Sequence, residues 1–221
     1  MISTATQIDI TLENILEFEQ RYRATFINSL GGFKSLALIG TKSVNGQANL
    51  AVFNSLFHVG AHPPLFGFVV RPDSVDRHTL KNITETGEFT VNQVSAEFFM
   101  HAHQTSARYD ADVSEFDATG LQEEYRPGCS APFVKESAIK YSARLSEKIN
   151  VALNGTIIVI GKVTMVSLPS VCLMPDGHID IEKAGSITCS GLDAYYAVRG
   201  LGRLTYAKTD RFPQFLQQKT S

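Results

Sequence analysis

The stretch of sequence that decides the fold is TKSVNGQANLAVFNSLFHVGAHPPLFGFVVRPDSVDRHTLKNITETGEFTVN, which runs from Thr41 to Asn92. Short runs rich in Val, Leu and Phe alternate in it with Gly, Pro and Asn, a pattern typical of β-strands joined by turns. Gly46 follows an asparagine, the commonest signal for a tight hairpin turn. The runs at 35–40 and 49–53 are therefore predicted to pair as an antiparallel hairpin.

Helices are predicted at three places. Apolar residues near helical spacing predict an N-terminal helix at about 11–24. Asp76 is predicted to cap a helix over 78–86, with Gly87 as its C-terminal stop. Ser95 is predicted to open a further helix over 96–107.

Most of the remaining chain is predicted to be strand or loop. Predicted strands lie at 64–70, 88–94, 139–149 and 155–168, of which the last is apolar enough to be expected largely buried, and short elements are predicted around 179–185 and 192–198. The polar stretch 108–132 is predicted to be a long loop with a functional role. About six strands with irregularly inserted helices disfavour a parallel sheet and indicate a mainly β fold. The pattern favours a closed barrel formed by a single domain over residues 1–221.

Composition excludes several classes of function. The chain has 20 Lys plus Arg and 22 Asp plus Glu, a net charge of −2, so it lacks the basic surface of a nucleic-acid or anionic-membrane binder. Its start lacks the basic and apolar segments of a secretory signal, and no apolar run reaches membrane-spanning length. Three widely spaced cysteines without a CxxC pair are expected to be reduced thiols. These features predict a cytoplasmic protein.

Charged and hydroxyl side chains gather at the start of the predicted helix 78–86. A helix N-terminus exposes unpaired N–H groups and a partial positive charge, which together bind phosphate. The side chains that can add hydrogen bonds there are Arg71, Ser74, Arg77, His78 and Thr79. The residues alone leave two interpretations open: a phosphate site, or an ordinary helix cap beside solvated arginines.

An ordered series of motifs runs through the same stretch. In chain order they are Gly46, Asn49-x-Ala51, Pro63-Pro64-Leu65, Arg77, Thr79, Asn82-Ile83 and Thr86-Gly87-Glu88-Phe89-x-Val91-Asn92. The series resembles the flavin reductase family of FMN-binding split barrels, and the resemblance extends to most of the chain. One departure is that the serine usual three residues after the motif's alanine falls at Asn54, with Ser55 beside it.

The resemblance implies a split β-barrel of Greek-key topology that binds FMN, or FAD, in a shallow groove near a homodimer interface. It implies that the phosphate lies at the start of the helix 78–86 and that the segment from Asn49 to Ser55 follows the edge of the flavin ring. The full set of expected cofactor-binding residues is Asn49, Leu50, Ala51, Asn54, Ser55, Arg71, Ser74, Arg77, His78, Thr79 and Asn82.

The second substrate implied by the resemblance is NADH or NADPH. No Rossmann fingerprint is present, so the nicotinamide is expected to stack transiently over the flavin. Side chains that could cover this stacking site are His101, Gln104, Ser106 and Phe116. Each of them has an alternative interpretation as helix surface or solvated loop. No metal is expected, because the histidines have no Cys or carboxylate partners at ligand spacing.

The resulting prediction is an NAD(P)H-dependent flavin reductase that transfers hydride from nicotinamide to flavin and uses no catalytic side chain. Its expected partners are an electron-accepting protein or a monooxygenase. A non-enzymatic FMN-binding electron carrier is the alternative. An oxidase of the pyridoxamine-phosphate type shares the barrel, but the motif series argues against it.

Overall fold

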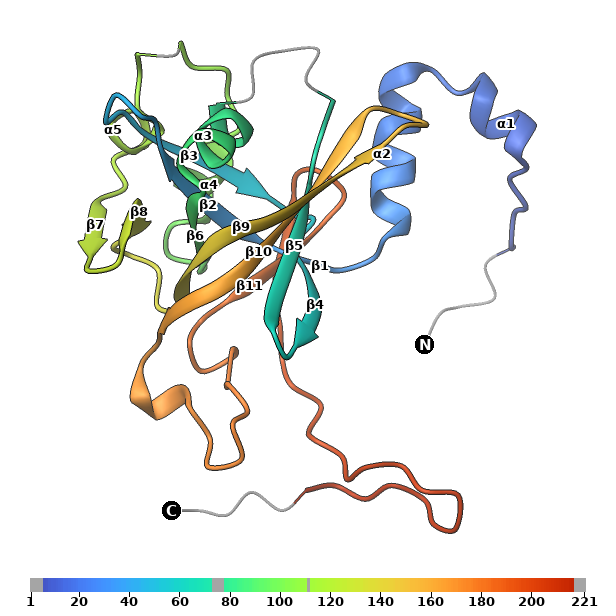
Figure 1. Ribbon diagram of the computed structural model, residues 1–221. Helices are drawn as coiled ribbons and strands as arrows, with labels where there is room; N and C mark the ends of the chain where they lie inside the picture. The colour runs from blue at the N-terminus through green and yellow to red at the C-terminus, as the bar shows by residue number, and fades with distance from the viewer. Residues whose placement is uncertain (1–5, 73–77, 111, 217–221) are drawn as a thin grey trace.

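The computed structural model describes residues 6–72, 78–110 and 112–216 (Figure 1). Its main element is a seven-stranded antiparallel sheet with the order β3–β2–β6–β9–β10–β5–β4. In chain order these strands are β2 (Ala37–Lys42), β3 (Ala48–Phe53), β4 (Phe57–Ala61), β5 (Pro64–Val70), β6 (Glu88–Gln93), β9 (Lys140–Val151) and β10 (Thr156–Ser167). The outermost strands, β3 and β4, do not pair with each other. The barrel is therefore split, and the closed barrel expected from strand counting is wrong.

The predicted hairpin at Gly46 is confirmed. β2 and β3 pair antiparallel in a register that sets Gly40 opposite Leu50. Gly46 has a φ of +91°, a conformation that favours glycine. The expected burial of 155–168 is wrong, since only Val159 and Gly161 of β10 are buried. Successive residues of a strand face opposite sides, and one side of β10 faces away from the barrel interior.

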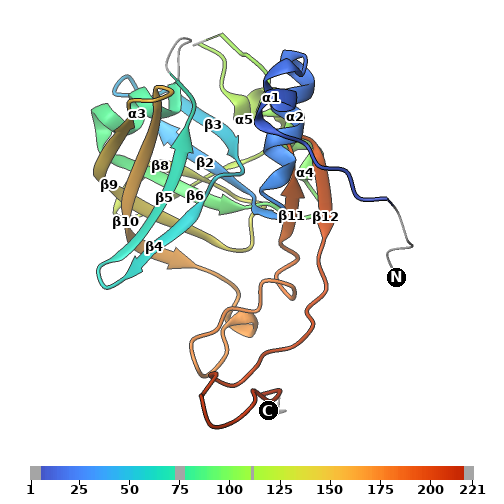
Figure 2. The same ribbon diagram turned by 90° about the vertical axis from the view of Figure 1, so that its right-hand side faces the viewer.

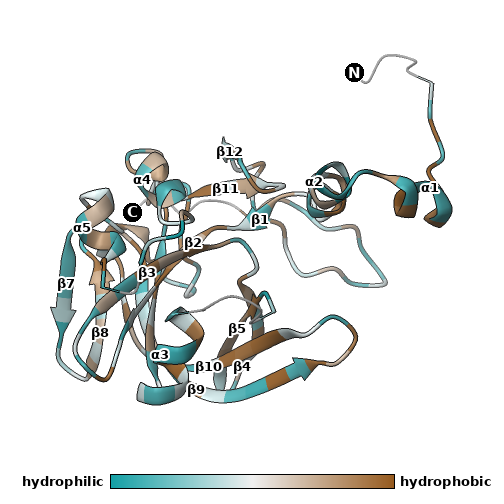
Figure 3. Cartoon of the chain, turned by 90° about the horizontal axis from the view of Figure 1, so that it is seen from above, coloured by the Kyte–Doolittle hydropathy of each residue, from teal (hydrophilic) through white to brown (hydrophobic). Residues whose placement is uncertain are grey.

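The predicted N-terminal helix is two helices, α1 (Leu12–Glu17) and α2 (Gln20–Leu30). The break falls at Phe18, whose ψ of 139° leaves the helical region. Glu19 restarts the chain by accepting hydrogen bonds from the backbone N–H groups of Arg21 and Tyr22. Neither helix contains a buried residue, and both stand away from the barrel when it is seen from above (Figure 3).

Two later helices lie close to their predicted positions. α3 (His78–Thr86) ends as expected at Gly87, which has a φ of +74°. Its expected cap, Asp76, lies outside the described residues. α4 (Phe99–Gln104) begins later than predicted, because a turn closed by the Phe98 N–H and the Ser95 carbonyl precedes it.

The stretch 108–132 is not the long loop that was predicted. It contains α5 (Glu115–Thr119), β7 (Glu123–Arg126) and the start of β8 (Cys129–Val134). The Thr90 hydroxyl on β6 donates to the Pro132 carbonyl at 2.6 Å, which attaches β8 to the main sheet. These elements are short and held by tertiary contacts, so their sequence shows little periodicity.

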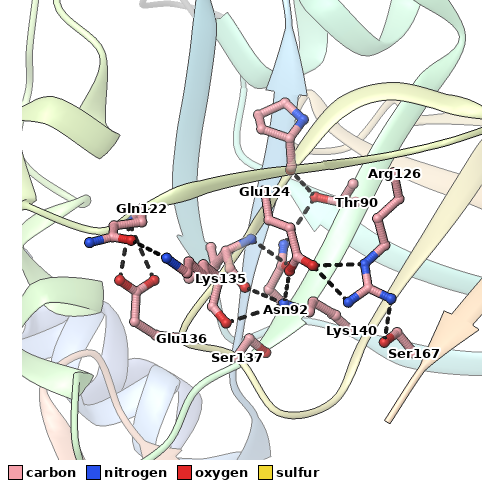
Figure 4. Close-up of polar contacts among 12 residues, drawn as sticks. Thr90, Asn92, Gln122, Glu124, Arg126, Lys135, Glu136, Ser137, Lys140 and Ser167 are labelled. Atoms are coloured by element: carbon pink, nitrogen blue, oxygen red, sulfur yellow. Dashed lines mark hydrogen bonds and ion pairs between the residues drawn. The ribbon is translucent and has the colours of Figure 1, made fainter.

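An ion-pair network attaches β7 to the sheet. Figure 4 shows Glu124 between Lys140 of β9 and Arg126. The Lys140 ammonium also donates to the carbonyls of Val134 and Lys135, and its side chain is only 4% exposed. The Arg126 guanidinium donates to Ser167 of β10 at 2.8 Å. The network therefore links β7 to two strands of the sheet.

The C-terminal part forms a second, three-stranded sheet and an extended arm. The sheet has the order β1–β11–β12, from β1 (Lys34–Ser35), β11 (Ile187–Ser190) and β12 (Ala194–Ala197); a short 3-10 helix, η1 (Ser170–Cys172), precedes β11. Residues 199–216 then run away from the barrel (Figures 1 and 2). The described residues thus contain twelve strands, twice the predicted number.

The core has two clusters on opposite sides of the sheet. One fills the barrel with residues such as Phe68, Ile83 and Phe89. The other packs Leu50 and Phe116 under α4, α5 and β8. Alternate residues of β3 therefore face different environments.

Candidate functional site

A groove of about 570 Å³ opens where β3, β5, α3 and the β11–β12 hairpin meet. The segment that follows α4 closes it on another side. The polar lining of the groove includes Arg71, His78, Thr79, Arg108 and Glu115. The apolar lining of the groove includes Leu36, Val52, Phe53, Leu192 and Tyr195. One groove thus combines cationic and hydroxyl groups with a wide apolar wall.

Most of the sequence-predicted residues line this groove. They are Asn49, Ala51, Asn54, Ser55, Arg71, His78, Thr79 and Ser106. Ser74 and Arg77 lie outside the described residues. Leu50 and Asn82 are buried and do not line the groove.

A buried hydrogen-bond network fixes α3 against the β2–β3 hairpin. The Asn49 amide donates to the hydroxyls of Thr41 at 3.2 Å and Thr79 at 3.1 Å. The Asn82 amide donates to the same Thr41 hydroxyl at 3.1 Å. Both hydrogens of the Asn49 amide nitrogen are engaged, so this group orients Thr79 toward the groove and is not a free donor.

The other two polar residues of this segment also have structural partners. The Asn54 amide donates to the Gly191 carbonyl at 2.9 Å, which links the end of β3 to the β11–β12 hairpin. The Ser55 hydroxyl donates to the Val69 carbonyl and accepts from the Val69 N–H. At this point of β5, the Ser55 side chain therefore makes the two hydrogen bonds that a neighbouring strand would otherwise make. Both side chains shape the groove.

Glu115 is a groove residue that the sequence did not reveal. It is the first residue of α5, is only 7% exposed, and accepts the Leu50 N–H at 2.9 Å. Burial raises the pKa of its carboxyl, against the opposing effect of the Leu50 hydrogen bond and of nearby His78. A buried acid in a polar groove is a common feature of functional sites.

Replacing Glu115 with glutamine is expected to raise the free energy of unfolding near neutral pH by about 0.5 to 2 kcal/mol. Glutamine can still accept the Leu50 N–H but carries no buried charge. The raised pKa means that the folded protein binds this proton more tightly than the unfolded chain does. Stability from the protonated carboxyl is therefore present at low pH and lost as pH rises through the folded pKa.

Urea unfolding of both proteins across pH measures this effect. The stability advantage of the glutamine variant should shrink as pH falls toward and below the ordinary glutamate pKa, because more of the wild-type carboxyl is then protonated. Asp117→Asn is the control, because Asp117 is an exposed acid on the same helix. A glutamine variant less stable than wild type at every pH would show that the charge is well accommodated.

The four residues expected on the nicotinamide side differ in their position relative to the groove. Ser106 lines the groove, and Gln104 donates to the hydroxyl of Tyr109, which does line it. The His101 ring bonds the Thr119 carbonyl and lies outside the groove. Phe116 is 1% exposed in the core and does not line the groove. It follows Glu115 on α5 and points inward.

An aromatic pair occupies that side of the groove instead. The His103 Nδ1 lies 2.6 Å from the Tyr195 hydroxyl, and the two rings meet edge to face. Burial raises the pKa of Tyr195, so its hydroxyl remains protonated. Tyr195 lies on the β11–β12 hairpin, far along the chain from β3, β5 and α3, and no local pattern could have identified it. His103 was not among the residues expected on the nicotinamide side.

Metal and membrane features are absent from the described part of the chain. Among residues 6–72, 78–110 and 112–216, no three His, Cys, Asp or Glu side chains come together as a metal site. No described helix has the length and apolar character needed to cross a bilayer.

The fold and groove define a class: a split β-barrel with a groove that combines cationic groups and an apolar wall. Residues 33–177 match the flavin reductase like domain. A candidate flavin reductase with a split barrel domain from Shewanella frigidimarina is 48% identical, with a TM-score of 0.88, over 91% of this chain and 100% of that one. The chain belongs to the flavin reductase-like domain family, which confirms the resemblance and the fold class.

More distant relatives also match most of the chain. Nitrilotriacetate monooxygenase component B from Bacillus cereus has a TM-score of 0.79 at 21% identity, covering 91% of this chain and 100% of that one. An uncharacterised Aquifex aeolicus protein is 27% identical over 171 residues, 76% of this chain and 85% of its own length. Family membership supports an oxidoreductase role that involves a flavin.

Proposed function

We propose that the protein is an NAD(P)H-dependent flavin reductase that binds FMN in the groove described above. The observation that carries the proposal is the combination of Arg71, His78 and Thr79 at one end of the groove with an apolar wall along it. A flavin mononucleotide needs both: a counter-charge for its phosphate and a flat apolar surface for its ring.

The residues present fit such a ligand. The groove volume of about 570 Å³ lies within the usual range for small-molecule sites. Phosphate is expected at the start of α3, where backbone N–H groups, the Thr79 hydroxyl and Arg71 can converge. Ser74 and Arg77 remain sequence-based members of this cluster. The ring is expected beside Ala51 and the end of β3.

The chain's residues position the reactants, and no side chain is assigned an acid, base or nucleophile role. Bound flavin supplies the hydride chemistry. NADH or NADPH is proposed to enter over the exposed side, where Ser106, His103 and Tyr195 line the groove. We further propose a cytoplasmic homodimer that passes electrons to an acceptor such as a monooxygenase, in line with the name of the Bacillus cereus relative.

An anaerobic absorbance assay tests the proposed function. Purified protein is titrated with FMN and with FAD, and NADH or NADPH is then added while nicotinamide absorbance is followed. Consumption of either nucleotide with reduction of the flavin is the expected result. Flavin binding without nicotinamide oxidation would instead favour an electron carrier. Absence of flavin binding would exclude both the flavin reductase and the electron carrier.

Replacing Arg71 with alanine is expected to weaken FMN binding by about 1.5 to 3 kcal/mol, or roughly 10- to 100-fold in dissociation constant. Arg71 is exposed in the free groove and is available to the phosphate. Fluorescence titration with FMN measures the change. Riboflavin, which lacks the phosphate, should bind both proteins equally.

The control for this prediction is Arg21→Ala, which removes an exposed arginine from α2, away from the groove. It should leave both affinities unchanged. An equal loss of riboflavin and FMN binding in Arg71→Ala would mean that Arg71 shapes the groove and does not bind phosphate.

A further inference from the structure

The C-terminal arm, residues 199–216, is an ordered hairpin with exposed apolar side chains. The Thr205 N–H donates to the Gln214 carbonyl and the Leu216 N–H to the Arg203 carbonyl, both at 2.8 Å. Leu201 is 96% exposed and Phe212 is 90% exposed. Side chains of this size are rarely left in water together unless they form an interaction surface.

The arm is attached to its own barrel only at its root. The Gly200 N–H donates to Glu182, and Arg203 pairs with Asp176 at 2.7 Å. Within the described chain, residues 204–216 make no hydrogen bond or ion pair outside the arm. Figures 1 and 2 both show this hairpin projecting from the lower end of the molecule.

A second unpartnered surface lies at the other end. α1, α2 and the segment before them enclose a groove of about 550 Å³, here called the helical groove, lined by Ile8, Ile10, Asn14, Glu17, Phe18 and Tyr22. Neither helix buries a residue. In Figures 1 and 2 these helices lie far from the arm. The helical groove is apolar enough to take an aromatic side chain.

The two surfaces have complementary charges. The arm carries four basic residues, Arg199, Arg203, Lys208 and Arg211, and one acidic residue, Asp210. Residues 9–19, which contain α1, carry four acidic residues and no basic one: Asp9, Glu13, Glu17 and Glu19. A basic aromatic arm therefore matches an acidic apolar groove.

We propose that the arm of one copy docks in the helical groove of a second copy, and that the second arm makes the same contact in return. Because the two surfaces lie at opposite ends of the chain, two copies related by a two-fold axis bring each arm against the helical groove of the other copy. The two contacts are equivalent and close the dimer. The exposed aromatic residues of the arm would enter the helical groove while its basic residues face the acids of α1. This inference rests on the homodimer proposed above and names the surface that forms it.

Reciprocal charge reversal tests the contact. The arm variant carries Lys208→Glu and Arg211→Glu, and the helix variant carries Glu13→Lys and Glu17→Lys. Each variant alone places like charges across both contacts, and its dimer dissociation constant should rise at least about tenfold. In an equimolar mixture, the heterodimer has opposite charges at both contacts, so wild-type affinity should return. Sedimentation velocity measures all three samples.

The mixture also separates this proposal from docking within one copy, which mixing could not repair. A double reversal on exposed barrel lysines, Lys148→Glu and Lys162→Glu, is the control and should leave the dimer intact. Phe212→Ser provides an uncharged test, because this residue contributes little to the fold of a single copy. It should weaken the dimer without changing the circular dichroism spectrum.

A monomeric wild-type protein, undisturbed dimers in both variants, or a mixture that stays dissociated would each overturn the proposal. FMN titration of the same samples reports the proposed function separately. Flavin binding with a dimer that does not need the arm would refute only the arm contact, whereas a stable dimer without flavin binding would refute only the flavin reductase.

Discussion

Replacing Glu124 with glutamine is expected to lower the free energy of unfolding by about 3 kcal/mol. Glu124 is the only carboxylate paired with Lys140 among the described residues, and the Lys140 side chain is 4% exposed. The substitution leaves a buried ammonium with two carbonyl partners and no counter-charge. Urea denaturation near neutral pH measures the loss.

The neighbouring acid provides a matched control. The Glu123 side chain is exposed, and among the described residues it bonds only the Tyr125 hydroxyl, so Glu123→Gln should change stability by less than about 0.5 kcal/mol. Equal effects of the two substitutions would show that the ion pair contributes no more than a surface contact.

The same ion pair predicts a pH dependence. The hydrogen bond from Lys140, opposed in part by burial, lowers the pKa of Glu124. A carboxyl whose pKa is lower in the folded protein than in the unfolded chain stabilises the fold above the ordinary glutamate pKa. This contribution is lost as pH falls through the pKa of the folded protein. The difference between wild type and Glu124→Gln should therefore shrink in acid. A constant difference across pH would mean that charge is not its cause.

Replacing Gly40 with alanine is expected to cost about 3 kcal/mol of stability, the upper part of the range for overpacking. A Cβ at this position of β2 would collide with the Pro132 carbonyl and lie 2.5 Å from the Thr90 hydroxyl oxygen. These two groups form the 2.6 Å hydrogen bond that attaches β8 to the sheet. The backbone cannot move aside without breaking that bond.

Gly60→Ala is the control for this clash. Gly60 also lies in a strand, but its Cβ would meet only the Pro63 carbonyl, at an ordinary 3.7 Å. This change should be neutral or slightly stabilising. If both alanine variants unfold at the wild-type urea concentration, β8 must have room to shift, and its attachment is looser than the hydrogen bond implies.

Strand alternation could have improved the site prediction from sequence. Asn49 and Ala51 line the groove, whereas Leu50 between them points into the core. A period of two along β3 predicts this division, because successive side chains face opposite sides of a sheet. The motif match included all three residues because a motif does not distinguish side chains that face a ligand from those that support the strand.

Asn82 is a different case. It belongs to the motif and lies one turn into α3, yet its amide bonds the Thr41 hydroxyl in a buried network. Its contribution is to hold the helix against the hairpin, and sequence alone could not separate that role from direct contact. A polar residue in a binding motif can act by positioning the element that binds.

The sequence by itself determined the local elements. The hairpin at Gly46, the helix 78–86 and its stop at Gly87 depend on turn chemistry and hydrophobic spacing within a few residues. The family resemblance lies in the same stretch, so it was equally accessible. Tertiary structure alone decided that Glu115 reaches Leu50 across 65 residues and that Tyr195 meets His103. The two side-chain contacts depend on how distant segments pack together, and packing leaves no periodic signal in either segment.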